Sequence, residues 1–482
     1  MTTDAISGNR PADREATART LSAIWSRLER WLPLLFLAYA LPMVAFLSVT
    51  MPAYLNPDET NHVMRAEQVS HGAPLNWRTG PFDAGGQIDT SLLSLLEVYW
   101  PILAEADKHV TRSIQDRAQA VRWSGQRMFA NTPNTAVYPP TLYLPVTVAI
   151  WVGKAAKLPV ETTLILGRLI NGAVAASLTA LAIALAARGR FVIFTTMLLP
   201  MALAQFASCS QDALLLSGGA LLAALLSRPM CGRRPATGAE YVGAGILIAV
   251  LSMSRPTNLV FILPLLLPSV APRMTGRLSA LTVVGSVVAA TLAWIAWVAV
   301  YVQVPQPHSG IVPMMGDQIR HLIADPLSLA TVLWNTALTY SHGYYIMMVA
   351  YLGWGQAAFG APTWFYVTAG VVLLLACTTE ALTPPSLTRQ HLAIAWLSVG
   401  ASFLGILVIQ YLSFSRVGGP VVEGVQGRYF LPLAAAAGLL MPAIAAPAAL
   451  RLAAAVPVLV FPVATLLTVP MMVIGRFYLQ AG

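Results

Sequence analysis

Long apolar runs alternate with short polar segments along most of the chain, which is the pattern of a protein that crosses a membrane many times. A helix needs about 20 apolar residues to span the hydrocarbon core, and the first such run covers residues 31–51. This run and ten later ones together predict an all-α polytopic membrane protein with about eleven crossings, in a range of ten to thirteen. The later runs are residues 163–187, 191–206, 212–227, 241–254, 257–271, 278–303, 362–380, 391–412, 429–446 and 452–474.

The composition excludes a soluble protein. Of the 482 residues, 57% are hydrophobic and only 10% are charged, which leaves too little polar surface to face water on all sides. The formal net charge of +9 comes mostly from basic residues in short loops, so we expect contact with anionic lipid headgroups and not with nucleic acid. The three cysteines share no CxxC spacing, so they indicate neither a metal site nor a disulfide framework.

Basic residues also predict the orientation. Residues 1–30 are rich in arginine and lack the apolar core of a signal peptide, so we expect a cytoplasmic N-terminal arm. Residues 52–162 then form a large, helical outer loop. Within it, residues 141–156 are apolar but short and end near Lys154, and a crossing there would reverse the side of every later loop. We therefore predict an interfacial helix on the outer leaflet. The remaining segments are residues 163–303 with spans two to seven, a second outer loop at 304–361, and residues 362–482 with the last spans.

The most informative polar stretch follows the first span directly. A helix here would place Asp58, His62 and Arg65 on one stripe, because positions i, i+4 and i+7 share a helix face. Such a stripe could face a binding site. A purely structural interpretation is also open, in which Asn56 caps the helix and Glu59 lies three residues later. Capping explains Glu59 better than it explains His62 and Arg65.

Asp212 is a second signal, because it opens a predicted span and is the only carboxylate between Glu161 and Glu240. The predicted orientation puts it at the outer face, on the same side as Asp58 and Glu59. A carboxylate at membrane depth is costly unless it is paired or functional. Asp212 could also serve only as a cap for the helix that starts at the next residue.

Two arginines are predicted at the outer ends of spans, where basic residues are uncommon. Arg428 follows a glycine-rich loop, and its planar guanidinium suits a phosphate group, although it could also anchor a lipid headgroup. Arg255 could be a second phosphate ligand or could snorkel to the interface. Arg168, inside an apolar run, could snorkel or pair with a carboxylate of the outer loop. Trp354 could stack on a sugar ring or belong to an aromatic belt.

Four short motifs occur in order across most of the chain. They are Pro57-Asp58-Glu59 with His62 and Arg65-Ala66, then Tyr138-Pro139-Pro140, then Ser210-Gln211-Asp212, then Gln426-Gly427-Arg428-Tyr429. In this order they resemble the GT-C superfamily of membrane glycosyltransferases, which includes oligosaccharyltransferases, protein mannosyltransferases and aminoarabinose transferases. The chain looks closest to an uncharacterised bacterial family of predicted polytopic membrane proteins, known only as a domain of unknown function.

The resemblance implies a role for each of these polar residues. It makes Asp58, Glu59 and Asp212 the catalytic carboxylates, and a donor phosphate would bind Arg428 and Arg255. Carboxylate oxygens suit Mg²⁺ or Mn²⁺, so a metal ion held between Asp58 and Asp212 is a further expectation, although some relatives work without one. Supporting roles fall to His62, Arg65, Gln211, Gln426, Tyr429 and Tyr138.

The resemblance also implies a GT-C-like fold and an enzyme that moves a hexose or pentose from a polyprenyl-phosphate donor to a hydroxyl group of a glycan, lipid or protein. The site would face outward from the bacterial inner membrane. The chain lacks the large C-terminal soluble domain of better-studied members, which makes transfer of an oligosaccharide to protein less expected. A transporter or flippase for lipid-linked sugars is the alternative, and an assembly subunit without chemistry is a third. Transporters tend to show internal repeats and charges at mid-membrane, whereas the polar residues here gather on one face.

Overall fold

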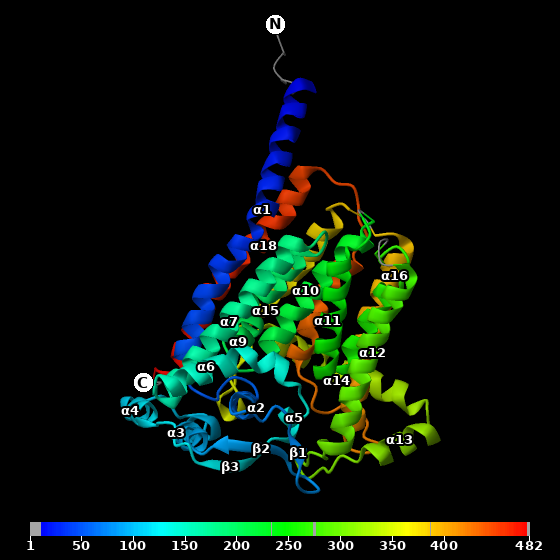
Figure 1. The fold of residues 1–482 in the computed structure, drawn as a ribbon. Coiled ribbons are helices and arrows are strands. Elements are labelled where there is room, and N and C mark those ends of the chain that lie inside the picture. The colour runs from blue at the N-terminus through cyan, green and yellow to red at the C-terminus, as the bar shows by residue number, and fades with distance from the viewer. Residues whose placement is uncertain (1–10, 233, 273–275, 386, 480–482) are drawn as a thin grey trace.

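The computed structural model describes residues 11–232, 234–272, 276–385 and 387–479, and it is mostly helical (Figure 1). Among these residues, seven helices are long and apolar enough to cross a membrane. They are α1 (Pro11–Thr50), α7 (Val160–Leu185), α10 (Asp212–Met230), α12 (Gly276–Tyr301), α15 (Thr363–Ala381), α16 (Arg389–Ser413) and α18 (Ala448–Phe477). The prediction of a membrane protein with several apolar helices is therefore confirmed.

Four of the predicted crossings are shorter or broken helices, so the count of about eleven is not confirmed. These segments are α8 (Arg190–Met197) with α9 (Pro200–Phe206), then α11 (Gly238–Ser254), then the 3-10 helix η2 (Pro256–Leu266), and finally η4 (Gly427–Phe430) with α17 (Leu431–Ala436) and η5 (Ala437–Leu440). Three breaks have a proline in the first turn of the new helix, at Pro200, Pro256 and Pro432, where the missing N–H costs no bond. Many residues of these segments are buried, so neighbouring segments can form hydrogen bonds with the backbone N–H and C=O groups that the breaks leave unpaired.

The first helix is longer than the predicted span. The arm expected at residues 1–30 is helical from Pro11, and α1 continues as one helix to Thr50. The part of that arm at residues 1–10 lies outside the described residues. In Figure 1 the N-terminal half of α1 rises beyond the rest of the molecule. Alanine, glutamate, leucine and arginine recur in residues 11–30, and because these residues favour helices, no break separates the arm from the span.

α7 packs tightly against α1, α10 and the helix α6 (Leu144–Ala155). Gly172 of α7 faces α1, and an added Cβ atom there would lie 2.4 Å from the Val44 side chain, so this close approach requires glycine. Arg188 follows α7 and donates hydrogen bonds to backbone carbonyls of the 383–385 and 438–442 segments. It ties three segments together at the end of the bundle far from the first loop.

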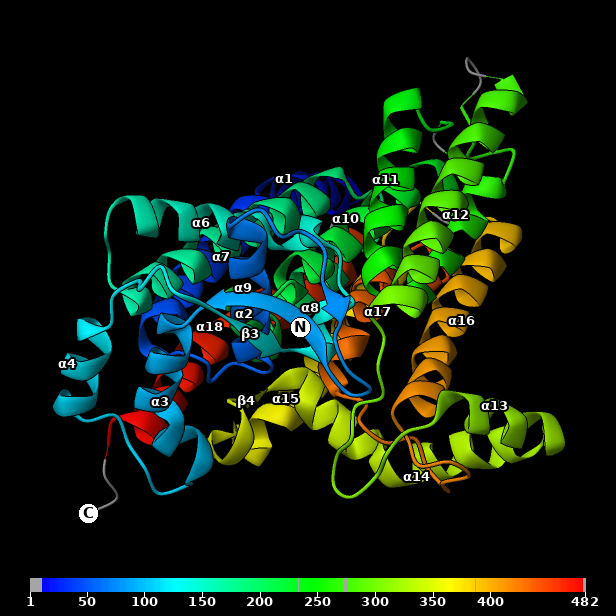
Figure 2. The same cartoon turned by 60° about the horizontal axis from the view of Figure 1, so that its bottom comes forward.

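The first loop carries a small sheet as well as helices, so the expectation of an all-helical protein is wrong in this loop. Its helices are α2 (Glu59–Ser70), α3 (Ser91–Ala104), α4 (Arg112–Ala120), α5 (Pro133–Ala136), η1 (Pro140–Tyr143) and α6. The antiparallel sheet has the order β1 (Trp77–Arg78), β2 (Ala84–Asp89) and β3 (Arg127–Asn131), and it lies across the face seen in Figure 2. Gly85 and Gly86 are the second and third residues of β2, and because glycine is depleted in strands, the sequence pattern did not predict this sheet.

The segment predicted as a second outer loop, residues 304–361, also contains helices. They are α13 (Met315–Ala324) and α14 (Ser328–Val349), followed by a hairpin of β4 (Tyr351–Leu352) and β5 (Phe359–Gly360) around η3 (Gly355–Ala357). Figure 2 shows α13 and α14 at the edge of the molecule. Trp354 lies in the hairpin.

Contacts at both ends of α6 keep it beside the first loop. Tyr143 directly precedes α6, and its hydroxyl group lies 2.7 Å from Nδ1 of His62 in α2. In its last turn, Lys154 Nζ lies 2.6 Å from a carboxylate oxygen of Glu67, in the same helix α2. A helix of 12 residues is about 18 Å long, which is too short to cross the hydrocarbon core. These contacts support the predicted interfacial helix.

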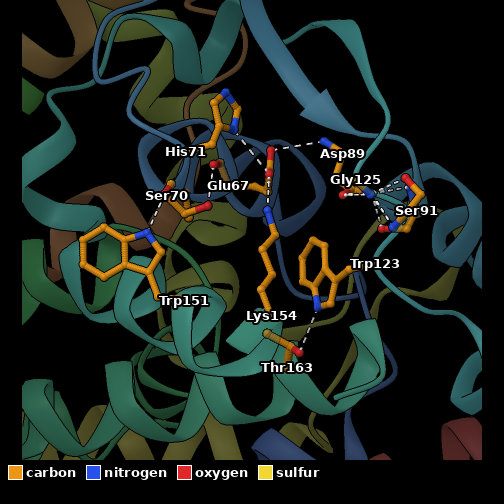
Figure 3. Close-up of polar contacts among 12 residues, drawn as sticks. Glu67, Ser70, His71, Asp89, Ser91, Trp123, Gly125, Trp151, Lys154 and Thr163 are labelled. Atoms are coloured by element: carbon orange, nitrogen blue, oxygen red, sulfur yellow. Dashed lines mark hydrogen bonds and ion pairs between the residues drawn. The ribbon is translucent and has the colours of Figure 1, made fainter. Parts of the chain in front are cut away.

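Glu67 is the centre of a buried polar network that joins α2, α6 and the sheet (Figure 3). It accepts hydrogen bonds from Lys154 and from the backbone N–H of Asp89, and His71 Nδ1 lies 3.3 Å away. The Lys154 ammonium group also lies 4.6 Å from the ring centre of Trp123. The Asp89 carboxylate accepts further bonds from Ser91, Ser124 and Gly125. The network fixes the loop to the interfacial helix.

We predict that position 157, just after α6, is reached from the same side of the membrane as the first loop. In a variant without the native cysteines, Lys157→Cys and the loop variant Gln87→Cys should react with an impermeant maleimide added to the same side. Thr20→Cys, in the N-terminal half of α1, should react only from the opposite side. All three positions are exposed. Labelling of Lys157→Cys from the side that labels Thr20→Cys would show that α6 crosses the bilayer.

Candidate functional site

Asp58 precedes α2 in an uncommon backbone conformation. Its φ of 58° falls in the left-handed region, which non-glycine residues seldom adopt and which costs about 1 to 3 kcal/mol. The helix begins at Glu59, so Asp58 occupies the cap position that was predicted for Asn56. The Asp58 side chain turns to Arg428 and not to the helix N–H groups.

Four charged side chains form a row in which acids and bases alternate, and we call this row the ionic chain: Asp58, Arg428, Asp212 and Arg255. The Arg428 guanidinium forms an ion pair with Asp58, and its Nε atom lies 3.6 Å from Oδ2 of Asp212. The other Asp212 oxygen, Oδ1, lies 3.5 Å from Nη2 of Arg255. All four were predicted as site residues, and the structure brings them together from four separate segments.

Tyr429 lies against both guanidinium groups of the ionic chain. Its ring centre is 4.1 Å from Cζ of Arg255 and 5.7 Å from Cζ of Arg428. Such cation–π contacts are favourable and hold guanidinium groups in place. The ring of Tyr429 therefore lies where it can hold both arginines in place.

Arg428 is only 4% exposed, yet its Nε and Nη1 atoms lack a hydrogen-bond partner among the described residues. Leaving buried N–H donors unpaired is costly, so this guanidinium has donor capacity left for a ligand. Gly427 brings η4 close to α14, because an added Cβ atom would lie 2.0 Å from the carbonyl oxygen of Tyr344. This close packing positions Arg428.

Two cavities meet at the ionic chain. The larger has a volume of about 470 Å³ and is lined by Asp58. The smaller has a volume of about 270 Å³ and is lined by Arg428 among mainly apolar side chains. Trp354 and Gln426 line both cavities. The larger cavity therefore has the carboxylate of Asp58 in its wall, and the smaller cavity has the guanidinium of Arg428. These two groups form an ion pair.

The predicted supporting residues either line the larger cavity or lie behind its wall. His62 stacks on Tyr138 with 6.1 Å between ring centres, and burial lowers the pKa of His62, so we expect a neutral imidazole. Arg65 is fully buried and donates a hydrogen bond to the Tyr138 carbonyl oxygen. Gln211 accepts a bond from Ser254, a residue of the wall. The supporting residues in the wall itself are Tyr138, Gln426 and Tyr429.

Arg255 differs from its predicted role as a second phosphate ligand. It is not among the described residues that line either cavity. Its contacts are with Asp212 and with the ring of Tyr429. Arg255 therefore lies where it can hold Asp212 and Tyr429 in place at the end of the ionic chain.

Glu59 forms a buried ion pair with Arg168 and lines neither cavity in the described part of the chain, so its predicted catalytic role is not supported. Arg168 Nη2 lies 2.6 Å from Oε2 and its Nε lies 2.8 Å from Oε1. The backbone N–H of Cys209 donates a further bond to Glu59. Burial acts to raise the pKa of Glu59, but the charge and hydrogen bonds of Arg168 outweigh it and lower the pKa. Of the two alternatives for Arg168, the structure shows the pair with a loop carboxylate.

A metal ion between Asp58 and Asp212 was a further expectation. In the structure, the Arg428 guanidinium lies between these carboxylates and contacts both. No group of three or more His, Cys, Asp or Glu side chains that could hold a metal ion occurs within the described ranges. The side chains therefore fit a site bridged by arginine better than a site built around a metal.

Several wall residues were not predicted from the sequence. Gln303, Gln306 and Gln410 line the larger cavity, and nothing in their local sequence marks them. Trp354, by contrast, was identified from the sequence as a residue that could stack on a sugar ring, and it lies between Gly353 and Gly355, whose positive φ angles allow the tight hairpin. Glycines on both sides of a tryptophan were the available clue.

Comparisons with known proteins identify a family but no relative of established structure. A family model described as “Predicted membrane protein (DUF2142)” matches residues 23–437, which include the whole ionic chain. No curated protein and no solved structure matches the chain. The match confirms the expected membrane family of unknown function, and it is silent on the GT-C superfamily.

We predict that Glu59→Gln destabilises the protein by about 3 to 5 kcal/mol, because it leaves the buried Arg168 charge without an anionic partner. Thermal unfolding in detergent should show a lower transition temperature. Glu15→Gln is the matched control, since Glu15 pairs with Arg19 at an exposed position and the loss of such a pair costs about 0 to 1 kcal/mol. Equal effects of the two substitutions would contradict the importance of the buried pair.

Stability should also depend on pH through Glu59. Because the pKa of Glu59 is lower in the folded protein, the contribution of the ion pair is complete above the unfolded-state pKa and is lost as pH falls through the folded-state pKa. The difference in unfolding free energy between wild type and Glu59→Gln should therefore stay constant from about pH 8 to pH 5 and shrink below. Chemical unfolding at several pH values measures this difference, and a decline already at neutral pH would refute the assignment.

Proposed function

The chain belongs to the DUF2142 family of predicted membrane proteins, and we propose that it is a glycosyltransferase of the GT-C type. It moves a hexosyl or pentosyl group from a polyprenyl-phosphate donor to a hydroxyl group of a glycan, lipid or protein acceptor. The reaction takes place at the outer face of the bacterial inner membrane, where the first loop lies. The observation that carries this proposal is the ionic chain at the junction of two cavities, one with a carboxylate and one with a guanidinium.

Arg428 is suited to bind the phosphate group of the donor. It lines the smaller, mainly apolar cavity, and its Nη1 atom has no hydrogen-bond partner among the described residues. A polyprenyl phosphate has the matching chemistry, with an anionic head and an apolar tail. Guanidinium groups bind phosphate oxygens through two parallel hydrogen bonds, and fixed positive charge in a partly dry site stabilises a leaving phosphate.

Asp58 is suited to act on the acceptor hydroxyl group. Its side chain is 20% exposed and lines the larger cavity, whereas the Asp212 side chain is 7% exposed. In the proposed reaction, the acceptor oxygen forms a bond to the anomeric carbon while the bond from that carbon to the phosphate oxygen breaks. The phosphate leaves with the electron pair, and the acceptor proton passes to Asp58. Such general base catalysis contributes typically a factor of about 10² to 10⁴.

Asp212 acts in this scheme through the two arginines. Its carboxylate oxygens lie near Arg428 on one side and Arg255 on the other. Asp212 therefore holds the guanidinium of Arg428 in position through its Nε side. The resemblance to GT-C enzymes is consistent with these carboxylates, since it implies an acidic residue or pair after the first span, at Asp58 and Glu59, and a second carboxylate after the third, at Asp212.

A transporter or flippase for lipid-linked sugars is the alternative from another class. It would use Arg428 to bind the same phosphate, but it would leave the bond between sugar and phosphate intact. Release of free polyprenyl phosphate in the presence of an acceptor therefore distinguishes a transferase from a transporter. The left-handed backbone of Asp58, which places its carboxylate beside the phosphate ligand, favours the transferase, because a transporter needs no base there.

We predict that Arg428→Lys weakens binding of a polyprenyl-phosphate hexose, because lysine keeps the charge but loses the planar fork. Arg428→Ala should weaken it further, by about 2 to 5 kcal/mol. Asp58→Asn should abolish release of polyprenyl phosphate while donor binding stays nearly unchanged, since a base acts in the transition state. Purified protein in nanodiscs allows both measurements, with released lipid phosphate detected by mass spectrometry.

Arg320→Lys and Asp317→Asn are the matched controls, because they alter an exposed ion pair of α13. Both should bind and convert the donor like wild type. If Arg428→Ala binds the donor as tightly as wild type, Arg428 is a headgroup anchor and its phosphate role is wrong. If wild-type protein moves the donor across vesicle bilayers and releases no lipid phosphate, the transporter alternative holds.

A further inference from the structure

The wall of the larger cavity is rich in side-chain amides. Gln303 and Gln306 follow α12, Gln410 belongs to α16, and Gln426 precedes η4. Asn134 of α5 adds a fifth amide. Polar groups inside a membrane protein are costly unless they have partners or a function. The convergence of amides from separate segments on one cavity therefore indicates a polar ligand.

These amides are available to a ligand. None of the four glutamine side chains has a hydrogen-bond partner in the part of the chain that the structure describes, while Asn134 already accepts a bond from Asn61. Trp294, in the same wall, has a buried indole N–H that also lacks a partner there. Each free amide offers two donors and one acceptor oxygen. Sugar hydroxyl groups, which both donate and accept, are complementary to such a set.

Aromatic rings give the cavity apolar faces as well. Trp294, Trp354 and Phe414 line it, together with the tyrosines already described. The C–H faces of a sugar ring can pack on such surfaces while its hydroxyl groups point to the amides. A few placed polar groups among aromatic side chains are typical of small-molecule sites, and about 470 Å³ is within their usual size.

The cavity wall offers no positive charge. Among the described residues that line it, Asp58 alone has a charged side chain, and that charge is negative. A carboxylate group on a bound sugar would therefore lose its hydration without gaining an ion pair, which is strongly unfavourable. Hydroxyl groups can exchange water for amides without this loss.

We propose that the larger cavity is the sugar subsite of the donor and that it selects an uncharged, polyhydroxylated sugar over a uronic acid. This inference rests on the proposed function, because it places the donor phosphate on Arg428. The attached sugar then extends past Trp354 and Gln426, which line both cavities, and reaches Gln306 and Gln410. The amides form hydrogen bonds with the hydroxyl groups, and the lack of a cationic side chain among the described residues of the wall excludes sugars that carry a carboxylate.

Binding to purified protein in nanodiscs tests the inference without an acceptor. The probes are undecaprenyl phosphate, its glucosyl, galactosyl and mannosyl forms, and the matching uronic acid forms. At least one hexosyl lipid should bind about tenfold more tightly than undecaprenyl phosphate, and its uronic acid form should gain nothing over the bare lipid. The hexose gain is the affinity for the hexosyl lipid divided by the affinity for undecaprenyl phosphate. Gln306→Ala and Gln410→Ala should each reduce this gain by about fivefold and leave binding of undecaprenyl phosphate unchanged. Gln87→Ala, at an exposed position of β2, is the control and should change neither.

The outcomes separate this inference from the function on which it rests. If undecaprenyl phosphate binds in a manner that depends on Arg428, but uronic acid forms bind as tightly as hexosyl forms, the inference is overturned and the phosphate role stands. The same holds if no hexosyl lipid binds more tightly than the bare lipid, or if both glutamine variants keep the full hexose gain. If undecaprenyl phosphate and all its sugar forms fail to bind, the proposed function itself is wrong.

Discussion

Glu59 and Arg168 meet where the end of α1, the start of α2 and the turn before α10 converge. Arg168 donates to backbone carbonyls at the end of α1 as well as to Glu59, and Glu59 accepts the N–H of Cys209. Asp58 is the neighbour of Glu59 in sequence, and Asp212 follows Cys209 by three residues. One cluster of buried bonds thus fixes both carboxylates of the ionic chain. Because burying two charges is itself expensive, such a pair contributes more to a defined geometry than to net stability.

Every member of the ionic chain lies at the end of a helix or at a break between helical segments. Asp58 precedes α2, Asp212 opens α10, Arg255 separates α11 from η2, and Arg428 belongs to η4. In lipid, backbone N–H and C=O groups must be paired within the protein, so irregular segments are tolerated only where they are buried or line a cavity. The regular spans α12 and α16 face outward over most of their length, whereas α10 is largely buried. The most exposed spans therefore contribute no member of the ionic chain, which is built where helices start or break.

The sequence could predict those features that are energetically unfavourable in a membrane unless they have a partner or a function. Charged residues near a membrane are expensive, so Asp58, Asp212 and Arg428 could be recognised singly and assigned to one face. The sequence could not separate Asp58 from Glu59, because the left-handed turn decides which of two adjacent carboxylates faces the cavity. The number of crossings was out of reach, since apolar runs of similar length form both lipid-facing spans and buried, broken helices. Glutamines such as Gln410 were missed because a neutral amide near a membrane is not unusual by itself. Only the folded structure shows that several of them line one cavity.

The ion pair between Asp58 and Arg428 matters for the way a bound anion would leave. A phosphate that reaches Arg428 competes with a carboxylate that belongs to the protein, and that carboxylate stays within reach throughout. In the proposed reaction, Asp58 can pair with the guanidinium again once it has lost the acceptor proton, so a carboxylate of the protein then replaces the departing phosphate. Release of product often limits turnover in enzymes, and a built-in competitor lowers that barrier. In the proposed enzyme, the same ion pair would hold Asp58 on Arg428 until a substrate separates them, which would limit loss of the donor to water.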